Sequence, residues 1–217
     1  MSKEIAERLE QTALIPVLRA SSAKEAHAMV DAMVAGGVEV LEVTMTVPGA
    51  IGILRELKQN FGDRILLGSG TVTTVADCEA TIEAGAEFVV SPSLHLDVIA
   101  LTRKAGKLSI PGALTPTEVI TAWRAGADYV KVFPCSALGG ASYLKALKAP
   151  FPEIRLIPTG GVTLTTAADF LHAGASALGV GTDLVNPAAI AKGEAQTIME
   201  TARRYLQVIA QARVPVS

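Results

Sequence analysis

Residues 125–134 read AGADYVKVFP, and this stretch contains the pattern that decides the fold: an Ala-Gly pair, a turn and an apolar β-rich run. The pair follows a helical stretch, and its glycine can take the left-handed conformation that ends a helix. The same pattern recurs at four other places: Ala35-Gly36 before VEVLEVT, Ala84-Gly85 before EFVVSP, Ala105-Gly106 before KLSIPG and Ala173-Gly174 before SALGVG. Successive copies lie about 20 or about 49 residues apart, a spacing of one or two βα units. The repeat therefore predicts parallel strands that alternate with helices.

Three further apolar runs lie between the copies, at Leu14–Leu18, Ile65–Leu67 and Ile154–Ile157. With the five runs above they make eight strand candidates, separated by short loops and without a break in composition. We therefore expect an α/β fold, a single (β/α)8 TIM barrel over residues 1–217, rather than an open doubly wound sheet. The segment Ser2–Gln11 is expected to be an extra N-terminal helix outside the repeat.

The composition agrees with this fold class and excludes several functions. Half of the residues are hydrophobic but only 4% are aromatic, as is typical of buried parallel strands rich in Ala, Val, Ile and Leu. A net charge of −2 offers no basic surface for nucleic acid or for a membrane. Two cysteines, Cys78 and Cys135, are too few for a disulfide framework. The charged start of the chain is unlike a signal peptide, and no apolar run reaches about 18 residues, so we expect a cytoplasmic protein.

Lys131 is the most informative single residue. Alternation along DYVKVFP places Lys131 on the same face as Tyr129 and Phe133, in a central strand. A lysine is costly to bury in its charged form, and a neutral buried amine is what Schiff-base chemistry on a carbonyl requires. The alternative is a structural role, in which Lys131 reaches solvent or pairs with an acid.

Two other charged residues close neighbouring strands, where the chemistry of such barrels takes place. Glu42 is the acid on the inner face of VEVLEVT, which makes it a candidate general acid/base, with a salt bridge as the alternative. Arg19 closes the first strand and suits a carboxylate or a phosphate, or else pairs with an acid at the rim.

Glycine-rich turns follow the seventh and eighth strand candidates. PTGG supplies Thr159, Gly160 and Gly161, and GVGT supplies Gly181 and Thr182. Backbone N–H groups at these two positions form the phosphate site common to many barrels. The alternative is that these glycines serve only to connect a strand to the next helix, which explains either turn alone but explains the two together less well. The three histidines are scattered without acids at ligand spacing, so we expect no metal and no cofactor.

Taken together, these segments resemble the KDPG/KHG aldolase family, where KDPG is 2-keto-3-deoxy-6-phosphogluconate and KHG is 4-hydroxy-2-oxoglutarate. The phrases that carry the resemblance are LEVTMTVP, GSGTV, SPSLH, IPGALTPTE, VKVFPCSALGG, PTGG and GVGT. They occur in the family's order from about Leu14 to about Leu184. The resemblance implies a metal-independent class I aldolase, a carbon–carbon lyase of the Entner–Doudoroff pathway and usually a homotrimer. Such an enzyme cleaves KDPG, a phosphorylated 2-keto-3-deoxy sugar acid, to pyruvate and glyceraldehyde 3-phosphate.

The resemblance also implies roles for individual residues. Lys131 matches the Schiff-base lysine and Glu42 the acid/base residue. Thr71 matches a threonine that holds the pyruvyl carboxylate, and Pro92 and Phe133 match residues that line the pocket. The substrate-binding turns correspond to Thr159, Gly160, Gly161, Gly181 and Thr182.

One departure leaves the substrate open. Many members have a carboxylate-binding arginine four residues after the glutamate, where this chain has Thr46. Phosphogalactonate-type members have an arginine at the end of the first strand instead, and Arg19 fits that pattern. The alternatives are therefore KDPG, its galactonate epimer KDPGal, and KHG, which would yield pyruvate and glyoxylate. Other barrel enzymes, such as metal-dependent pyruvate aldolases or sugar-phosphate epimerases, and a non-catalytic sugar-phosphate-binding barrel are the rival functions.

Overall fold

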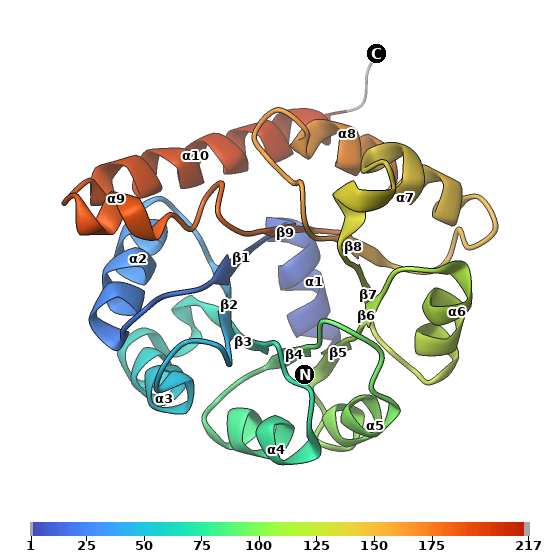
Figure 1. The fold of residues 1–217 in the computed structure, drawn as a ribbon, viewed down its shortest axis with the longest axis horizontal. Helices are drawn as coiled ribbons and strands as arrows, with labels where there is room; N and C mark the ends of the chain where they lie inside the picture. Colours follow the sequence, from blue (N-terminus) through green and yellow to red (C-terminus); the bar gives the residue numbers. More distant parts are fainter. Residues whose placement is uncertain (1, 215–217) are drawn as a thin grey trace.

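A computed structural model describes residues 2–214, with helices arranged in a ring around a central group of strands (Figure 1). The strands are β1 (Leu14–Leu18), β2 (Val40–Thr44), β3 (Leu66–Gly70), β4 (Phe88–Val90), β5 (Leu108–Ile110), β6 (Gly112–Ala113), β7 (Val130–Val132), β8 (Leu156–Pro158) and β9 (Leu178–Val180). The first five helices are α1 (Ser2–Thr12), α2 (Ala23–Ala35), α3 (Ala50–Phe61), α4 (Val75–Glu83) and α5 (Leu96–Lys104). The others are α6 (Pro116–Arg124), α7 (Ala141–Lys148), α8 (Ala167–His172), α9 (Pro187–Ala191) and α10 (Ala195–Ala212), with short 3-10 helices at η1 (Gly62–Arg64) and η2 (Cys135–Leu138). Within residues 2–214, none of these helices has the length and apolar character needed to cross a bilayer.

The strands are parallel and form two sheets. Six of them form a curled sheet in the order β5-β4-β3-β2-β1-β9, and three form a second sheet in the order β6-β7-β8. Isolated parallel bridges, Leu156 with Ala175 and Thr159 with Gly179, join the β8 side to the β9 side. The predicted alternation of strands and helices is thus confirmed as an α/β fold with a curled parallel sheet.

The predicted fifth strand, KLSIPG, is divided in the structure at Pro111. The carbonyl of Ile110 accepts from Ser91 N on the β4 side, whereas the carbonyl of Pro111 accepts from Lys131 N on the β7 side. Because proline has no N–H to donate, the ladder breaks there. The segment therefore contributes β5 to one sheet and β6 to the other.

Two other predicted strands have different bounds in the structure. The run Ile65–Leu67 continues to Gly70, since Thr44 pairs with Gly70 and Gly70 O accepts from Met45 N at 2.8 Å. The run Ile154–Ile157 becomes Leu156–Pro158. Glycine and proline disfavour strands when read alone, so pairing with the neighbouring strand overrides the local preference.

Strand register determines which side chains face the interior. Glu42 pairs with Val17 on one side and with Gly68 on the other, and Gly68 pairs in turn with Phe88. In parallel strands these partners lie on the same face. A Cβ at position 68 would lie 2.2 Å from the Phe88 ring, so glycine at this position makes room for a large aromatic side chain.

The predicted N-terminal helix is confirmed as α1, which crosses the middle of the ring (Figure 1). Its Ile5 and Leu9 are buried in the core, and it packs against β3 and β5. The hydroxyl of Tyr129, at the amino end of β7, donates to Glu10 Oε1 at 2.7 Å. Because α1 covers the amino ends of the strands, the carboxyl ends are left for the site.

Gly68→Ala is expected to destabilise the protein by about 1–3 kcal/mol, because the added methyl overpacks the Phe88 ring. At roughly 2–4 °C per kcal/mol for a chain of this size, thermal unfolding should begin several degrees lower. Gly52→Ala is the matched control, since no atom lies within 4 Å of a Cβ there and α3 favours alanine. Equal Tm values for the two variants would contradict the packing argument.

Candidate active site

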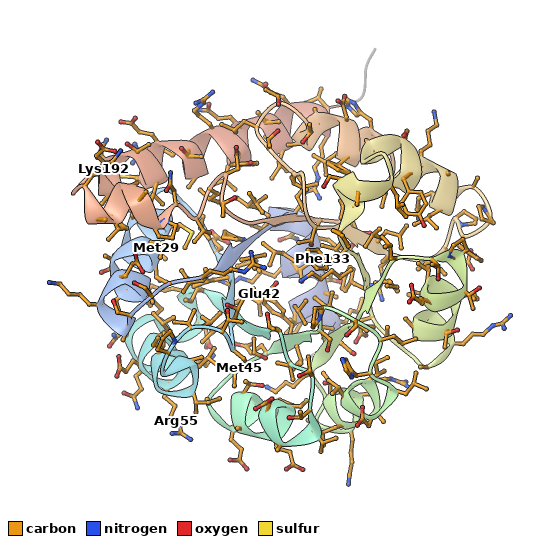
Figure 2. The ribbon with its side chains drawn as sticks, in the orientation of Figure 1. Met29, Glu42, Met45, Arg55, Phe133 and Lys192 are labelled. Atoms are coloured by element: carbon orange, nitrogen blue, oxygen red, sulfur yellow. The ribbon has the colours of Figure 1, made fainter. Side chains whose placement is uncertain are left out.

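Glu42 and Lys131 lie in the interior of the fold, on strands far apart in the sequence. Glu42 on β2 is 2% exposed and Lys131 on β7 is 5% exposed. Figure 2 shows Glu42 and Phe133 toward the middle of the ring, whereas Arg55 and Lys192 project outward. The alternation read from the sequence, with both charged residues facing inward, is thus confirmed by the structure.

The carboxylate of Glu42 occupies space that a glycine leaves open. A Cβ at position 70 would lie 1.8 Å from Glu42 Oε1, so a side chain at Gly70 would displace the carboxyl group. This same oxygen has no hydrogen-bond partner among the described residues. A buried acceptor without a partner costs free energy, and in enzymes such groups often mark the place of a substrate or water.

Burial raises the pKa of Glu42 above its ordinary value of 4.5, while the positive charges of Lys131 and then Arg19 oppose this shift. Desolvation is the largest of the three effects. Glu42 therefore stays protonated to a higher pH than an exposed glutamate.

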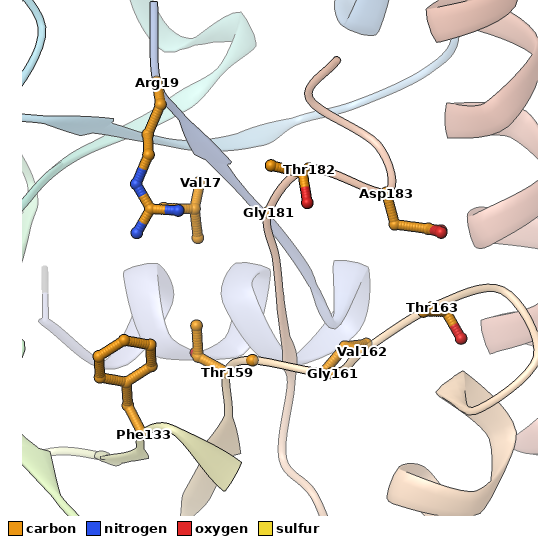
Figure 3. A pocket seen from close by; sticks show the side chains of 11 residues that line it. Val17, Arg19, Phe133, Thr159, Gly161, Val162, Thr163, Gly181, Thr182 and Asp183 are labelled. Carbon is orange, nitrogen blue, oxygen red and sulfur yellow. The ribbon is translucent and has the colours of Figure 1, made fainter. Parts of the chain in front are cut away.

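A pocket of about 400 Å³ opens at the carboxyl ends of the strands (Figure 3). The predicted residues that line it come from the ends of β1, β7, β8 and β9: Arg19, Phe133, Thr159, Gly160, Gly161, Gly181 and Thr182. The two glycine turns therefore lie in one pocket, as their spacing predicted. The Nη1 of Arg19 lies 3.6 Å from where a Cβ at Gly181 would stand, so the guanidinium is beside the second turn.

Phe133 connects the buried lysine with this pocket. Its ring lines the pocket, and Lys131 Nζ lies 5.2 Å from the ring centroid. An ammonium at this distance from a ring is attracted to the π face. The amine of Lys131 is thus adjacent to the pocket while remaining shielded from solvent.

Thr71 and Pro92 follow neighbouring strands but do not line this pocket. Thr71 comes directly after Gly70 and has a φ of 59°, a left-handed conformation that is strained for a threonine and is often found at functional sites. The carbonyl of Pro92 packs against Gly112, where a Cβ would approach it to 2.3 Å, and Gly112 pairs with Lys131. Thr71 therefore follows the glycine that makes room for Glu42, and Pro92 packs against the strand partner of Lys131.

Four residues that line the pocket were not predicted from the sequence: Val17, Val162, Thr163 and Asp183. Val17 could have been found by alternation from Arg19, which follows β1 directly and lines the same pocket. Asp183 directly follows Thr182 in the second turn, but a carboxylate is an unexpected lining for an anion site.

The sequence model of the family described as "KDPG and KHG aldolase" matches residues 5–201 of the chain. This chain belongs to the KDPG and KHG aldolase family. The match covers every predicted site residue and the pocket that the structure forms from them.

Individual members of this family are similar over nearly the whole chain. The 2-dehydro-3-deoxy-phosphogluconate aldolase of Treponema pallidum is 34% identical over 94% of this chain and 97% of its own. The 2-dehydro-3-deoxy-6-phosphogalactonate aldolase of Escherichia coli is 33% identical over 90% and 96%. A crystal structure of KDPG aldolase from Legionella pneumophila, with pyruvate captured as a covalent carbinolamine intermediate, has a TM-score of 0.85 at 30% identity, covering 92% of this chain and 96% of its own.

The titration of Glu42 tests the electrostatics of the interior. Arg19→Ala and Lys131→Met should each raise the pKa of Glu42 further, with the larger effect for Lys131, because each removes a charge that favours the carboxylate. Arg19→Lys keeps the charge and serves as the control. Carbon-13 NMR of labelled glutamate carboxyls gives the pKa directly. A pKa that does not move in Lys131→Met would show that the two groups are not electrostatically coupled.

Proposed function

We propose that this protein is a class I aldolase that cleaves KDPG to pyruvate and glyceraldehyde 3-phosphate, with Lys131 as its Schiff-base lysine. The observation that supports this most directly is the pairing of a buried lysine with a buried glutamate beside a pocket that contains two glycine turns. Membership of the KDPG and KHG aldolase family agrees with it.

The proposed reaction follows from the chemistry of these groups. Lys131 gives its proton to the Glu42 carboxylate, and its free amine attacks the C2 ketone. Glu42 then returns the proton to the departing hydroxyl, so that water leaves and an iminium forms. The Glu42 carboxylate accepts the proton of the C4 hydroxyl, directly or through a water, as the C3–C4 bond breaks and its electron pair moves to the iminium. The aldehyde leaves, Glu42 delivers the proton to C3 of the resulting enamine, and water hydrolyses the new iminium to release pyruvate and the amine. Covalent catalysis divides one difficult step into several easier ones.

Substrate recognition is proposed at two ends. Thr71 holds the pyruvyl carboxylate, with Pro92 and Phe133 beside it. The turns with Thr159, Gly160 and Gly161 and with Gly181 and Thr182 bind the phosphate through backbone N–H groups. Arg19 provides a charge-assisted contact with one of these anionic groups.

KDPGal and KHG are the other candidate substrates, because Arg19 takes the place of the arginine that many relatives have at the position of Thr46. The similarity to a phosphogalactonate aldolase favours retaining KDPGal as the second candidate. Measuring pyruvate release from KDPG, KDPGal and KHG in parallel identifies the preferred substrate. No release from any of the three would indicate a non-catalytic barrel.

We further propose that the strands close into a single-domain (β/α)8 barrel. The division of the fifth strand between both sheets and the bridges between the β8 and β9 sides support closure. On the family resemblance, we also propose that the protein assembles into a homotrimer. The two free, buried cysteines agree with a cytoplasmic location, which we propose as well.

Borohydride in the presence of pyruvate is expected to reduce the iminium to a stable adduct on Lys131. The mass gain should map to the peptide that contains Tyr129–Phe133, and Lys131→Met should abolish both trapping and turnover. Adducts on Lys145 or Lys148 of α7 would overturn the assignment. Repeating turnover in excess EDTA is the control for a metal-dependent aldolase, which would lose activity.

Arg19→Ala is expected to lower kcat/KM for KDPG about ten- to hundred-fold, since a charge-assisted contact contributes about 1.5–3 kcal/mol. Pyruvate trapping by Lys131 should remain detectable. An equal loss with KHG indicates that Arg19 binds the carboxylate, and a loss confined to KDPG indicates the phosphate. Arg19→Lys should recover part of the loss. Unchanged kinetics with both substrates would show that Arg19 binds neither end.

A further inference from the structure

Asp183, which carries a carboxylate, is among the residues that line the pocket to which the proposed function assigns a phosphate. It follows Thr182 directly, and no step of the proposed reaction uses it. Two negative groups in one pocket repel each other, and a free carboxylate beside Arg19 would also compete with the substrate for that guanidinium. The position is unfavourable for substrate binding unless the carboxylate is held away.

The structure contains such a restraint. The hydroxyl of Tyr205, on α10, donates to Asp183 Oδ2, and Leu164 N donates to the same oxygen at 3.3 Å. In Figure 3 the Asp183 side chain points away from Arg19 and Thr159. The bond from Leu164 is long, so the phenol provides the main restraint.

Tyr205 is well suited to this task. Its side chain is fully buried, and α10 packs against α2 and α8. Burial, together with Asp183, raises the pKa of the Tyr205 phenol far above its ordinary value, so the hydroxyl keeps its proton and donates at any physiological pH. A hydrogen bond to a carboxylate is among the stronger ones in proteins.

We propose that Tyr205 is a positioning residue that keeps the Asp183 carboxylate out of the phosphate end of the pocket and away from Arg19. Tyr205 touches no reacting atom; it acts through Asp183 and determines how well the pocket accepts an anion. This inference rests on the proposed function insofar as the anion is the phosphate of the substrate.

Tyr205→Phe removes only the hydroxyl. The KM for KDPG is expected to rise about tenfold with kcat within about twofold, while the KM for KHG, which has no phosphate, stays unchanged. Inorganic phosphate, titrated as a competitive inhibitor and by phosphorus NMR, should bind about tenfold more weakly. The effect should shrink at high salt, because screening weakens repulsion between partly exposed charges.

Asp183→Asn removes the negative charge of this side chain but keeps its size, so it shows whether charge or bulk weakens phosphate binding. In Tyr205→Phe/Asp183→Asn the side chain is released but neutral, so phosphate affinity should return to that of the parent. Failure of the double variant to recover would overturn the proposal, as would an unchanged KM in Tyr205→Phe. Tyr129→Phe is the matched control, because it removes another phenol–carboxylate bond at the opposite end of the strands and should leave KM unchanged.

Phosphate binding also separates this inference from the proposed function. If the parent protein binds phosphate but does not cleave KDPG, and Tyr205→Phe binds phosphate more weakly, the role of Tyr205 is supported and KDPG is refuted as the substrate. If the parent protein cleaves KDPG and Tyr205→Phe behaves identically, KDPG is supported as the substrate and the role of Tyr205 is refuted.

Discussion

The burial of the Glu42 carboxyl group is the constraint on which the rest of the interior depends. An acid removed from water raises its own pKa and tolerates ionisation only where positive charge is near. Lys131 and Arg19 provide that charge, and Gly70 provides the space. The same surroundings that make Glu42 costly to ionise make its carboxylate a stronger proton acceptor than an exposed one, which agrees with the acid/base role proposed for it. Stability and proposed catalysis thus place opposite demands on one side chain.

Much of this arrangement could be predicted from the sequence, and the reason is periodicity. The Ala-Gly repeat located most strands, and strict alternation placed Glu42 and Lys131 on inner faces because a strand has a side-chain period of two. The glycine turns were predicted as one site because carboxyl ends of parallel strands meet on one side of the fold. These are local signals that tertiary packing reinforces.

What could not be predicted depends on partners distant in the sequence. The division of the fifth strand at Pro111 requires knowledge of two neighbouring strands, since Ile110 and Pro111 bond to opposite sides. The sequence does not show why Gly68 and Gly70 are glycines: the Phe88 ring and the Glu42 carboxylate occupy the volume that their missing side chains leave. Asp183 was not predicted because its hydrogen-bond donor, Tyr205, lies on a helix that the strand pattern does not address.

The helix α1 across the amino ends of the strands has a consequence for the order of events. Ile5, Leu9 and the Tyr129–Glu10 bond fill that side of the interior, so the proposed substrate and products enter and leave at the carboxyl ends, where the pocket opens. In the proposed reaction the fragment bound to Lys131 is the inner one, and the phosphorylated aldehyde beside the glycine turns is the outer one. Entry from this side favours release of the aldehyde before pyruvate and, in the reverse direction, binding of pyruvate first.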